Sequence, residues 1–338
     1  MKNFSYHAET IMSQHCNLTE LARRAGVSLT TASRALNNHP YVADEVRQKV
    51  FAAAAGMNYF PKSAARKKRL GIIISDLGRV KFNFYQSSML FEIARQCSVR
   101  GIGIEMFSGG DLELVDENFL RAVIVFQESE LLELQKIRNA NFIGINTALP
   151  DSPGIFSDEV QGMEEVMSYL RRCGMRSVAL LLPHRTAAGH IGMRAELFRQ
   201  SAAGNGLAGT EDLILYMDED IEKQLKDLVA EKKAEALFIA GEDMACEVNC
   251  LLYRLGVKIP DDLSVVSFES SGMSEFMTPP HTTVAQNFEK LVSAALDLAE
   301  NIFEGKTDSR GFRKYIPFIF HERASVKTVL TANSNTKK

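Results

Sequence analysis

Near its N-terminus the chain gathers side chains whose chemistry suits contact with DNA. In the segment from 29 to 37 the polar residues recur on one side of a helix; they are Thr30, Thr31, Ser33 and Arg34. Short hydroxyls and a guanidinium are groups that reach phosphates and base edges in a major groove. Ala32 and Leu36 fall on the opposite side, which predicts a buried stripe. The segment is therefore expected to form a helix with one face open to a duplex.

A helix and a tight turn before this segment would hold it in place. Apolar residues recur at helical spacing from Leu18 to Ala25, and Thr19 supplies a polar start. Gly26 permits the positive φ of a short turn, and Ser28 can cap the helix that follows. The pattern predicts a helix-turn-helix unit. Two amphipathic helices around a glycine are common, so this pattern alone fits either a DNA-binding unit or an ordinary helical pair.

The surrounding sequence favours the DNA-binding interpretation. Residues 17 to 66 resemble the headpiece of lac-repressor-family transcription regulators, in ELARRAGVSLTTASRALN and in VADEVRQKVFAAAAGMNYFP, where a third helix is expected. The resemblance implies sequence-specific binding of a double-stranded DNA operator. Base contacts are expected from Leu29, Thr30 and Arg34, and phosphate contacts from Thr19, Ser28, Thr31, Ser33 and Asn37.

The basic segment KSAARKKR, residues 62 to 69, departs from the family. The resemblance implies a hinge helix that enters the minor groove and inserts a leucine between base pairs. Ala64 and Arg66 fit that hinge, but Lys68 stands where the leucine is expected. A lysine can meet a phosphate but cannot unstack bases, which predicts that this protein bends its operator less than its relatives do. The alternative is a solvated basic linker.

Charge divides the chain into a cationic head and an anionic body. Residues 1 to 70 hold 11 Lys and Arg against 4 Asp and Glu, a balance of +7. The remainder holds 28 against 38, a balance of −10. This split keeps attraction to a polyanion local to the head.

The cysteines and the absence of long apolar stretches predict a cytoplasmic protein. The 5 cysteines are scattered and odd in number, which suits reduced thiols rather than a disulfide framework. Cys246 and Cys250 lie one helical turn apart without the histidines or acidic residues of a metal site, so they are expected to be buried thiols. No stretch has the length of a secretion signal or of a membrane span, and no membrane partner is expected.

From Leu70 onward, short β-rich runs alternate with helical stretches, which predicts parallel sheets covered by helices on both faces. Two sets of runs predict two lobes. The first set is LGIIIS, GIGIEMF, AVIVF and FIGIN, with helices over 87–99, 113–120 and 129–139. The second set is SVALLL, DLILY, EALFIA and LSVVSF, with helices over 159–173, 192–204, 221–232 and 243–255. Ligands in such folds bind where the carboxyl ends of the strands face the gap.

The body resembles the effector-binding core of the same family, which is built like periplasmic sugar-binding proteins. The resemblance is carried by RRCGMRSVALL, AELFRQSA, MACEVNCLLYRLGVKIPDDLSVVSFESS and PPHTTVAQNFEKLVSAALDLAENI. The expected fold is an N-terminal all-α helix-turn-helix headpiece plus an α/β two-lobed periplasmic-binding-protein-like core with parallel sheets.

The expected domain boundaries follow from these patterns. A tail (1–16), the headpiece (17–61) and a linker (62–69) precede an effector-binding and dimerisation domain (70–330), and residues 331–338 form a second tail. Lobe one is expected at about 70–150 and 277–306, and lobe two at about 156–275 and 310–330. The three crossings between the lobes are expected near 149–158, 272–279 and 305–313.

The resemblance also implies a cleft site for a small-molecule effector, such as a sugar, a sugar phosphate or a related metabolite. Arg194 matches the family arginine that grips hydroxyls or carboxylates, and an ordinary salt bridge is its alternative role. Glu269 and Glu242 stand where the family carries aspartates. Phe238 ends a strand at the cleft, where it could stack on a ring or belong to the core. The other matching positions are Asn83, Phe84 and Asp158.

The sequence carries no pattern that predicts catalysis. It has no glycine-rich phosphate loop, no Gly-x-Ser-x-Gly elbow and no histidine cluster with metal spacing, so no catalytic residue, cofactor or metal is expected. The expected function is a DNA-binding transcriptional repressor whose operator affinity is controlled by an effector. A homodimer, possibly a tetramer, is expected because a two-fold operator demands a two-fold protein. The alternatives are an activator, or a ligand-binding sensor that has lost operator recognition.

Overall fold

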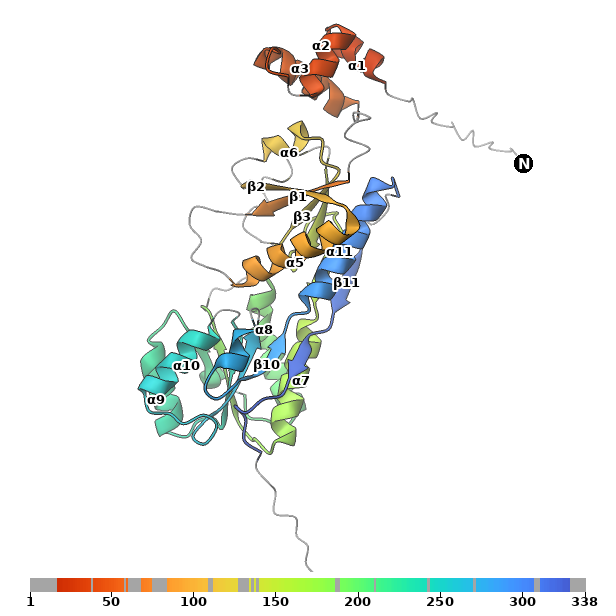
Figure 1. The fold of residues 1–338 in the computed structure, drawn as a ribbon. Coiled ribbons are helices and arrows are strands. Elements are labelled where there is room, and N and C mark those ends of the chain that lie inside the picture. Colours follow the sequence, from red (N-terminus) through yellow and green to blue (C-terminus); the bar gives the residue numbers. More distant parts are fainter. Residues whose placement is uncertain are drawn as a thin grey trace, which may run out of the picture.

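A computed structural model of the chain has a helical headpiece followed by two sheet-based lobes (Figure 1). It describes residues 17–328 except 38, 58, 60–67, 75–83, 109–111, 127–133, 135–136, 138–139, 186–188, 210, 242–243, 270–271 and 307–310. The headpiece lies at the end of the first lobe that is remote from the second lobe (Figure 1).

Three helices form the headpiece: α1 (Leu18–Ala25), α2 (Leu29–Leu36) and α3 (Asp44–Gly56). Each turns small or aliphatic side chains toward the others, and the buried residues are Leu21, Ala22, Ala32, Ala35, Val50 and Ala54. The buried stripe of α2 therefore runs through Ala35, and Leu36 lies half-buried at its edge.

The first lobe contains a six-stranded sheet in the order β11-β5-β4-β3-β1-β2, in which every neighbouring pair is parallel. Its strands are β1 (Arg69–Ile74), β2 (Gly103–Ser108), β3 (Ala122–Val125), β4 (Asn141–Ile145), β5 (Gly154–Ser157) and β11 (Arg313–Ile316). Helices α5 (Phe84–Arg100) and α11 (Phe288–Phe303) pack on one face, and α6 (Glu113–Glu117) packs on the other. The central strands β1 and β3 are almost wholly apolar because both of their faces are covered.

The second lobe repeats this plan with the order β12-β10-β9-β8-β6-β7, and only β12 runs antiparallel to its neighbour. Its strands are β6 (Val178–Leu182), β7 (Ile214–Tyr216), β8 (Ala236–Ile239), β9 (Ser264–Glu269), β10 (Thr282–Ala285) and β12 (Ile319–His321). Helices α7 (Glu159–Arg172) and α8 (Gly189–Gly204) cover one face, and α9 (Ile221–Ala230) and α10 (Ala245–Arg254) cover the other. Two 3-10 helices complete the lobe, η3 (Glu211–Leu213) and η4 (Met273–Phe276).

The first crossing between the lobes follows the prediction, since β5 belongs to the first sheet and α7 begins at Glu159 in the second lobe. The second crossing was expected near 272–279, which is wrong. Strand β10 still belongs to the second sheet, so the chain crosses at 286–287, just before α11, and residues 277–285 are part of lobe two.

The third crossing also lies later than the expected 305–313. Strand β11 pairs with β5 in the first sheet, and β12 pairs with β10 in the second, so the chain crosses at 317–318. The glycines and prolines near both expected crossings mark chain reversals within a lobe. Such turn signals do not say which sheet the next strand joins, which explains both errors.

The structure also corrects the expected end of α6 and the expected burial of two cysteines on α10. Helix α6 ends at Glu117 rather than near 120, and the helix expected over 129–139 lies mostly outside the described residues. Cys246 and Cys250 are exposed on α10, not buried, because Val248 and Leu251 occupy the inward face of that helix. Within the described part of the chain, no helix combines the length and apolar composition needed to cross a bilayer.

Candidate DNA-binding and effector sites

The turn between α1 and α2 fixes the orientation of the second helix. Asn17 caps α1, with Oδ1 accepting a first-turn amide hydrogen bond at 2.9 Å, so the helix starts before the predicted Thr19. Gly26 has φ 68° and ends α1 in the left-handed conformation that glycine adopts readily. Ser28 caps α2 as predicted, because its Oγ accepts the Thr31 N–H at 3.1 Å.

The outward face of α2 carries the three residues predicted to read bases. Leu29 is 49% exposed, although it is a large apolar side chain. Thr30 and Arg34 are exposed as well. No tertiary packing in the described headpiece explains an exposed leucine beside a threonine and an arginine, whereas a major groove offers thymine methyls and base acceptors to all three.

The residues predicted to bind phosphates fall into two groups. Thr19 and Ser28 are exposed at the starts of α1 and α2, where amide groups also point outward. Thr31 and Ser33 are half-buried, and the Thr31 hydroxyl lies 2.8 Å from the Ser28 hydroxyl. Asn37 is exposed but donates its side-chain amide to the Ser33 carbonyl at 2.8 Å, so it also acts as a local cap.

Sequence reasoning missed Tyr41, which follows α2 and is 89% exposed. Its ring lies 5.5 Å from the ring of His39, centroid to centroid. The sequence could have indicated its exposure, because this tyrosine lies between two predicted helices and outside the apolar stripe of either one. An exposed aromatic ring with a hydroxyl next to a DNA-reading helix is a further candidate for contact with a duplex.

The described end of the linker is tied to the first lobe. Lys68 donates to Glu300 of α11 at 2.9 Å, and both side chains are partly exposed. This hydrogen bond lowers the pKa of the Glu300 carboxyl. An exposed pair of this kind is weak, so it leaves Lys68 available for exchange to a phosphate. The other two predicted hinge contacts, Ala64 and Arg66, lie outside the described residues.

The carboxyl edges of the two sheets face each other. Strand β5 leads from the first sheet directly into α7 of the second lobe, and β10 leads from the second sheet into α11 of the first lobe. Both strands therefore end at the boundary between the lobes, which is where ligands of such folds bind.

Arg194, on α8, lies at this edge of the second sheet and is fully buried. Its Nε and Nη2 donate to the two carboxylate oxygens of Glu159, both at 2.9 Å. Its Nη1 donates to the Ala240 carbonyl at 2.7 Å, and the guanidinium lies 3.9 Å from the ring centroid of Phe268. The geometry matches the ordinary salt-bridge alternative rather than a guanidinium open to a ligand. Breaking a buried pair of this kind typically costs ~3–5 kcal/mol.

Glu269 ends β9 at the same edge and is also held by protein groups. Its Oε1 accepts the Ser274 N–H at 3.0 Å, and its Oε2 accepts the Thr283 hydroxyl at 2.9 Å. Arg323 lies 3.6 Å from the same carboxylate. In this conformation Glu269 therefore joins β9, η4 and β10.

Of the two alternatives for Phe238, a ring that stacks on a ligand at the cleft or a core residue, the structure matches the second. The side chain has no exposed area and stacks on Phe268 at 5.5 Å between centroids. It forms part of the apolar core beneath α7 and α8. A ligand could touch it only if that core opened.

The remaining predicted effector residues are partly placed. Asp158 is half-buried at the start of α7, with one carboxylate oxygen accepting the Gln161 N–H at 3.0 Å. Phe84 begins α5 at the edge of the first lobe and is half-buried. Asn83 and Glu242 lie outside the described residues.

A buried polar network that the sequence did not reveal joins two of the crossings. Asn146 has φ 53° and accepts the Ser157 N–H at 2.7 Å, just before the first crossing. Its Nδ2 donates to Gln286, at the second crossing, at 2.7 Å, and to the Tyr85 hydroxyl at 3.2 Å. The Ser157 hydroxyl also donates to Gln286 at 3.0 Å. The Asn146 side chain thus links two of the three segments that cross between the lobes.

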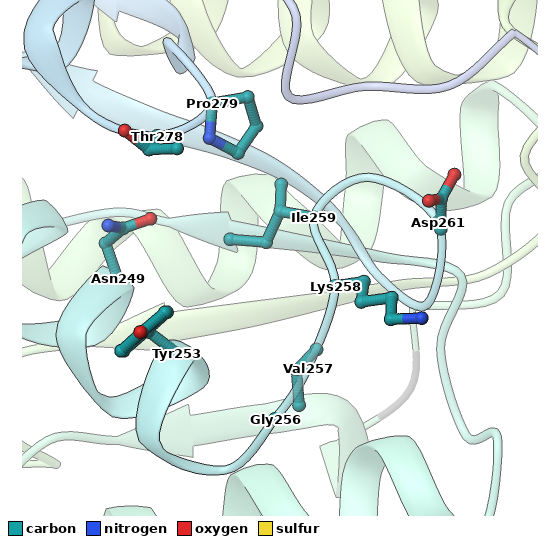
Figure 2. Close-up of a pocket in the computed structure, with 9 residues that line it drawn as sticks. All are labelled: Asn249, Tyr253, Gly256, Val257, Lys258, Ile259, Asp261, Thr278 and Pro279. Carbon is teal, nitrogen blue, oxygen red and sulfur yellow. The ribbon is translucent and has the colours of Figure 1, made fainter.

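A cavity of about 420 Å³ lies elsewhere in the second lobe. Figure 2 shows Asn249 and Tyr253 of α10 on one side of it and the turn at Thr278 and Pro279 on the other. These segments precede β9 and β10 or follow α10, so the cavity lies at the amino ends of those strands. It is therefore separate from the carboxyl edge where an effector is expected. No group of three or more His, Cys, Asp or Glu in the described chain could hold a metal ion.

Two family models match the chain. The model for bacterial regulatory proteins of the lacI family matches residues 17–62, and the model for a periplasmic binding protein-like domain matches residues 167–326. They correspond to the headpiece and to most of the second lobe together with α11 and β11 of the first lobe.

Relatives with known roles match nearly the whole chain. The HTH-type transcriptional repressor PurR of Vibrio cholerae is 25% identical over 92% of this chain and 98% of its own length. The probable HTH-type transcriptional repressor ExuR of Bacillus subtilis is 24% identical over 93% of this chain and 99% of its own.

Solved structures share the fold. The transcriptional regulator CelR in complex with cellobiose has a TM-score of 0.64 at 19% identity, covering 92% of this chain and 100% of that one. The lac repressor dimer bound to operator and the anti-inducer ONPF has a TM-score of 0.64 at 18% identity, covering 92% and 99%. With a lacI-type headpiece, a periplasmic-binding-protein-like core and repressors as full-length relatives, the chain belongs to the lacI family of bacterial regulatory proteins.

Proposed function

We propose that this protein is a cytoplasmic transcriptional repressor that binds a DNA operator as a dimer. The observation that carries the proposal is the exposed face of α2, where Leu29, Thr30 and Arg34 stand clear of the packed headpiece. The relatives PurR and ExuR are named as transcriptional repressors, which supports the same role for this chain.

Side-chain chemistry separates the headpiece residues that read bases from those that bind phosphates. Leu29, Thr30 and Arg34 read base edges, because apolar and bidentate contacts in the major groove distinguish base pairs. Thr19, Ser28 and the basic linker hold phosphates, which position the headpiece without reading sequence. The cationic head provides the salt-dependent part of the affinity.

An exposed apolar surface on the second lobe supports dimerisation through the core. Cys246, Cys250 and Tyr253 lie along the outer face of α10, and Phe276 of η4 is 74% exposed. Surfaces of this kind on a folded protein are typical of contacts with another protein. A two-fold dimer presents two headpieces to a pseudo-palindromic operator.

The effector occupies the boundary between the lobes and changes the angle between them. The CelR structure was solved with cellobiose, which supports a sugar or sugar derivative as the class of ligand here. Coupling between two such sites is typically ~1–3 kcal/mol, and DNA must change effector affinity by the same factor. The protein acts as a regulator without catalysis of its own.

Gel-shift assays with the full-length protein test this function. Fragments of the source genome are offered at physiological salt with excess random competitor, and one fragment class is expected to be retained. Arg34→Ala should weaken that preference while nonspecific binding persists. Equal retention of all fragments would contradict the proposal and favour a sensor that has lost operator recognition. Expression of the flanking genes in a deletion strain then separates repression, where expression rises, from activation, where it falls.

A further inference from the structure

The salt bridge between Arg194 and Glu159 occupies a place that an acidic ligand would need. Arg194 projects from α8 to the carboxyl edge of the second sheet, beside the ends of β8 and β9. At that edge a guanidinium is the natural partner of a ligand carboxylate or phosphate, because its fork of donors matches two oxygens at once. Here the two oxygens belong to Glu159, each 2.9 Å from a guanidinium nitrogen.

The pair is built in rather than incidental. Arg194 has no exposed area, and the Glu159 side chain is only 9% exposed. The guanidinium is also stacked on Phe268 and bonded to the Ala240 carbonyl, so its plane and its direction are both fixed. Glu159 lies in the first turn of α7, where the helix dipole favours a carboxylate.

The charges around this pair repel a second anion. Asp158 and Glu269 place two more carboxylates at the same edge, and Arg323 lies 3.6 Å from Glu269. Arg185, on the segment that follows β6 at this edge, is paired with Glu219 at 2.8 Å. The described groups at this edge therefore sum to a negative charge. An acidic ligand would have to displace Glu159 and leave that carboxylate near others of the same sign.

We propose that Glu159 is a permanent internal substitute for an acidic ligand, and that the effector of this protein is an uncharged, hydroxyl-bearing molecule. Hydroxyls suit an edge rich in carboxylate acceptors, and they need no free guanidinium. Arg194 is then a positioning residue that holds α7, α8 and β8 together. This inference rests on the proposed function in one respect only, namely that the ligand bound at this edge is the effector of a regulator.

Chemical rescue of Glu159→Ala tests the proposal in the full-length protein. Removing the carboxylate leaves a guanidinium facing a space that a small carboxylate can fill. Acetate is the probe, and sodium chloride at equal ionic strength is the control. The melting temperature of Glu159→Ala should lie well below that of the wild type and should rise by several degrees in acetate. Wild type should show no such rise, and Glu159→Ala combined with Arg194→Met should not respond.

Matched measurements keep the test decisive. Glu164→Ala removes another carboxylate of α7, which accepts hydrogen bonds from Ser201 and Asn205 on the exposed surface, and its melting temperature should not respond to acetate. If Glu159→Ala unfolds in chloride, it should refold in acetate and not in chloride. The same full-length wild type is titrated with D-glucuronate and D-glucose 6-phosphate, and neither should give a stabilisation that Arg194→Met removes.

Two results would overturn the proposal. One is an Arg194-dependent stabilisation of the wild type by glucuronate or glucose 6-phosphate. The other is a Glu159→Ala protein that acetate does not stabilise. Neither outcome involves operator binding, so a failed rescue leaves the proposed function standing, and a protein without operator preference would still show the rescue.

Discussion

The ring of Phe51 in α3 lies 5.2 Å from the ring of Phe119, centroid to centroid, so the headpiece and the first lobe touch directly. Phe119 follows α6, has φ 52° and is buried within the headpiece core. A phenylalanine in the left-handed region is strained by about 1–3 kcal/mol, and such strain persists only where surrounding contacts hold it. The linker is therefore not the sole connection between the reading head and the body.

We expect Phe119→Ala to release the headpiece from the first lobe. The contact with Phe51 is lost, and amide hydrogen exchange in α3 should become faster while exchange in β8 of the second lobe stays unchanged. Operator affinity should also depend less on the effector if this contact carries part of the coupling. Phe91→Ala, which removes an exposed phenylalanine of α5, is the matched control. Unchanged exchange in α3 would show that the aromatic contact does not restrain the headpiece.

Arg34→Ala should reduce the discrimination between operator and random DNA more than it reduces binding itself. Loss of one bidentate base contact typically costs ~1–3 kcal/mol of discrimination. Thr19→Ala changes a residue that we propose to bind phosphate, and it should weaken operator and random DNA alike. Competition titrations at two salt concentrations measure both ratios. If Arg34→Ala weakened both DNAs equally, Arg34 would be a phosphate contact.

Asn146→Ala should destabilise the junction between the lobes. The buried Ser157 N–H loses its acceptor, and alanine tolerates φ 53° less well than asparagine. The two effects together are expected to cost about 2–4 kcal/mol. Urea unfolding should show a lower midpoint than for Asn141→Ala, which removes an exposed hydrogen bond to the Arg121 carbonyl. Equal midpoints would mean that water replaces the lost side chain.

His281 should make the protein less stable in acid. Burial lowers the pKa of His281 from its usual 6.5 to about 4. The ring has no exposed area, and its Nε2 donates to Asn249 Oδ1 at 3.1 Å. Because the unfolded chain binds a proton near pH 6.5 and the folded chain does not, stability is full above pH 6.5 and falls as the pH drops toward about 4.

The loss of stability between neutral pH and a pH below about 4 should be about 3 kcal/mol, given 1.36 kcal/mol per pKa unit. His281→Gln should therefore flatten the dependence of the melting temperature on pH between 6.5 and 4, relative to wild type. His321→Gln, which changes an exposed histidine of β12, should leave that dependence unchanged. A wild-type slope retained in His281→Gln would assign the acid sensitivity to other groups.

The sequence predicted the elements that local rules determine. Gly26 forms the predicted turn and Ser28 the predicted helix cap. All eight strands that were predicted from apolar runs are present. The strands that escaped prediction are β5, β10, β11 and β12, which have only three or four residues each. They mix polar with apolar residues, so they lack the continuous apolar run that marks β3, β7 and β8, which are equally short.

The candidate effector site was less predictable because it depends on long-range contacts. Glu159 and Arg194 are 35 positions apart, and only the packing of α7 on α8 brings them together. Phe238 lies in a strand whose four residues are all buried, so no alternation indicated which side it faces. The Phe51 contact was equally hidden, since it joins two domains that each have a complete pattern of their own.

Tyr59 is buried in the headpiece and Lys68 is paired with Glu300 of α11, and eight residues separate these two positions. A peptide segment of that length spans at most about 30 Å when fully extended. The distance between Tyr59 and Lys68 can therefore never exceed this length. Deleting residues from this segment should narrow the range of half-site spacings that one dimer can bind. Adding residues should widen that range, and in both cases the bases that are read stay the same.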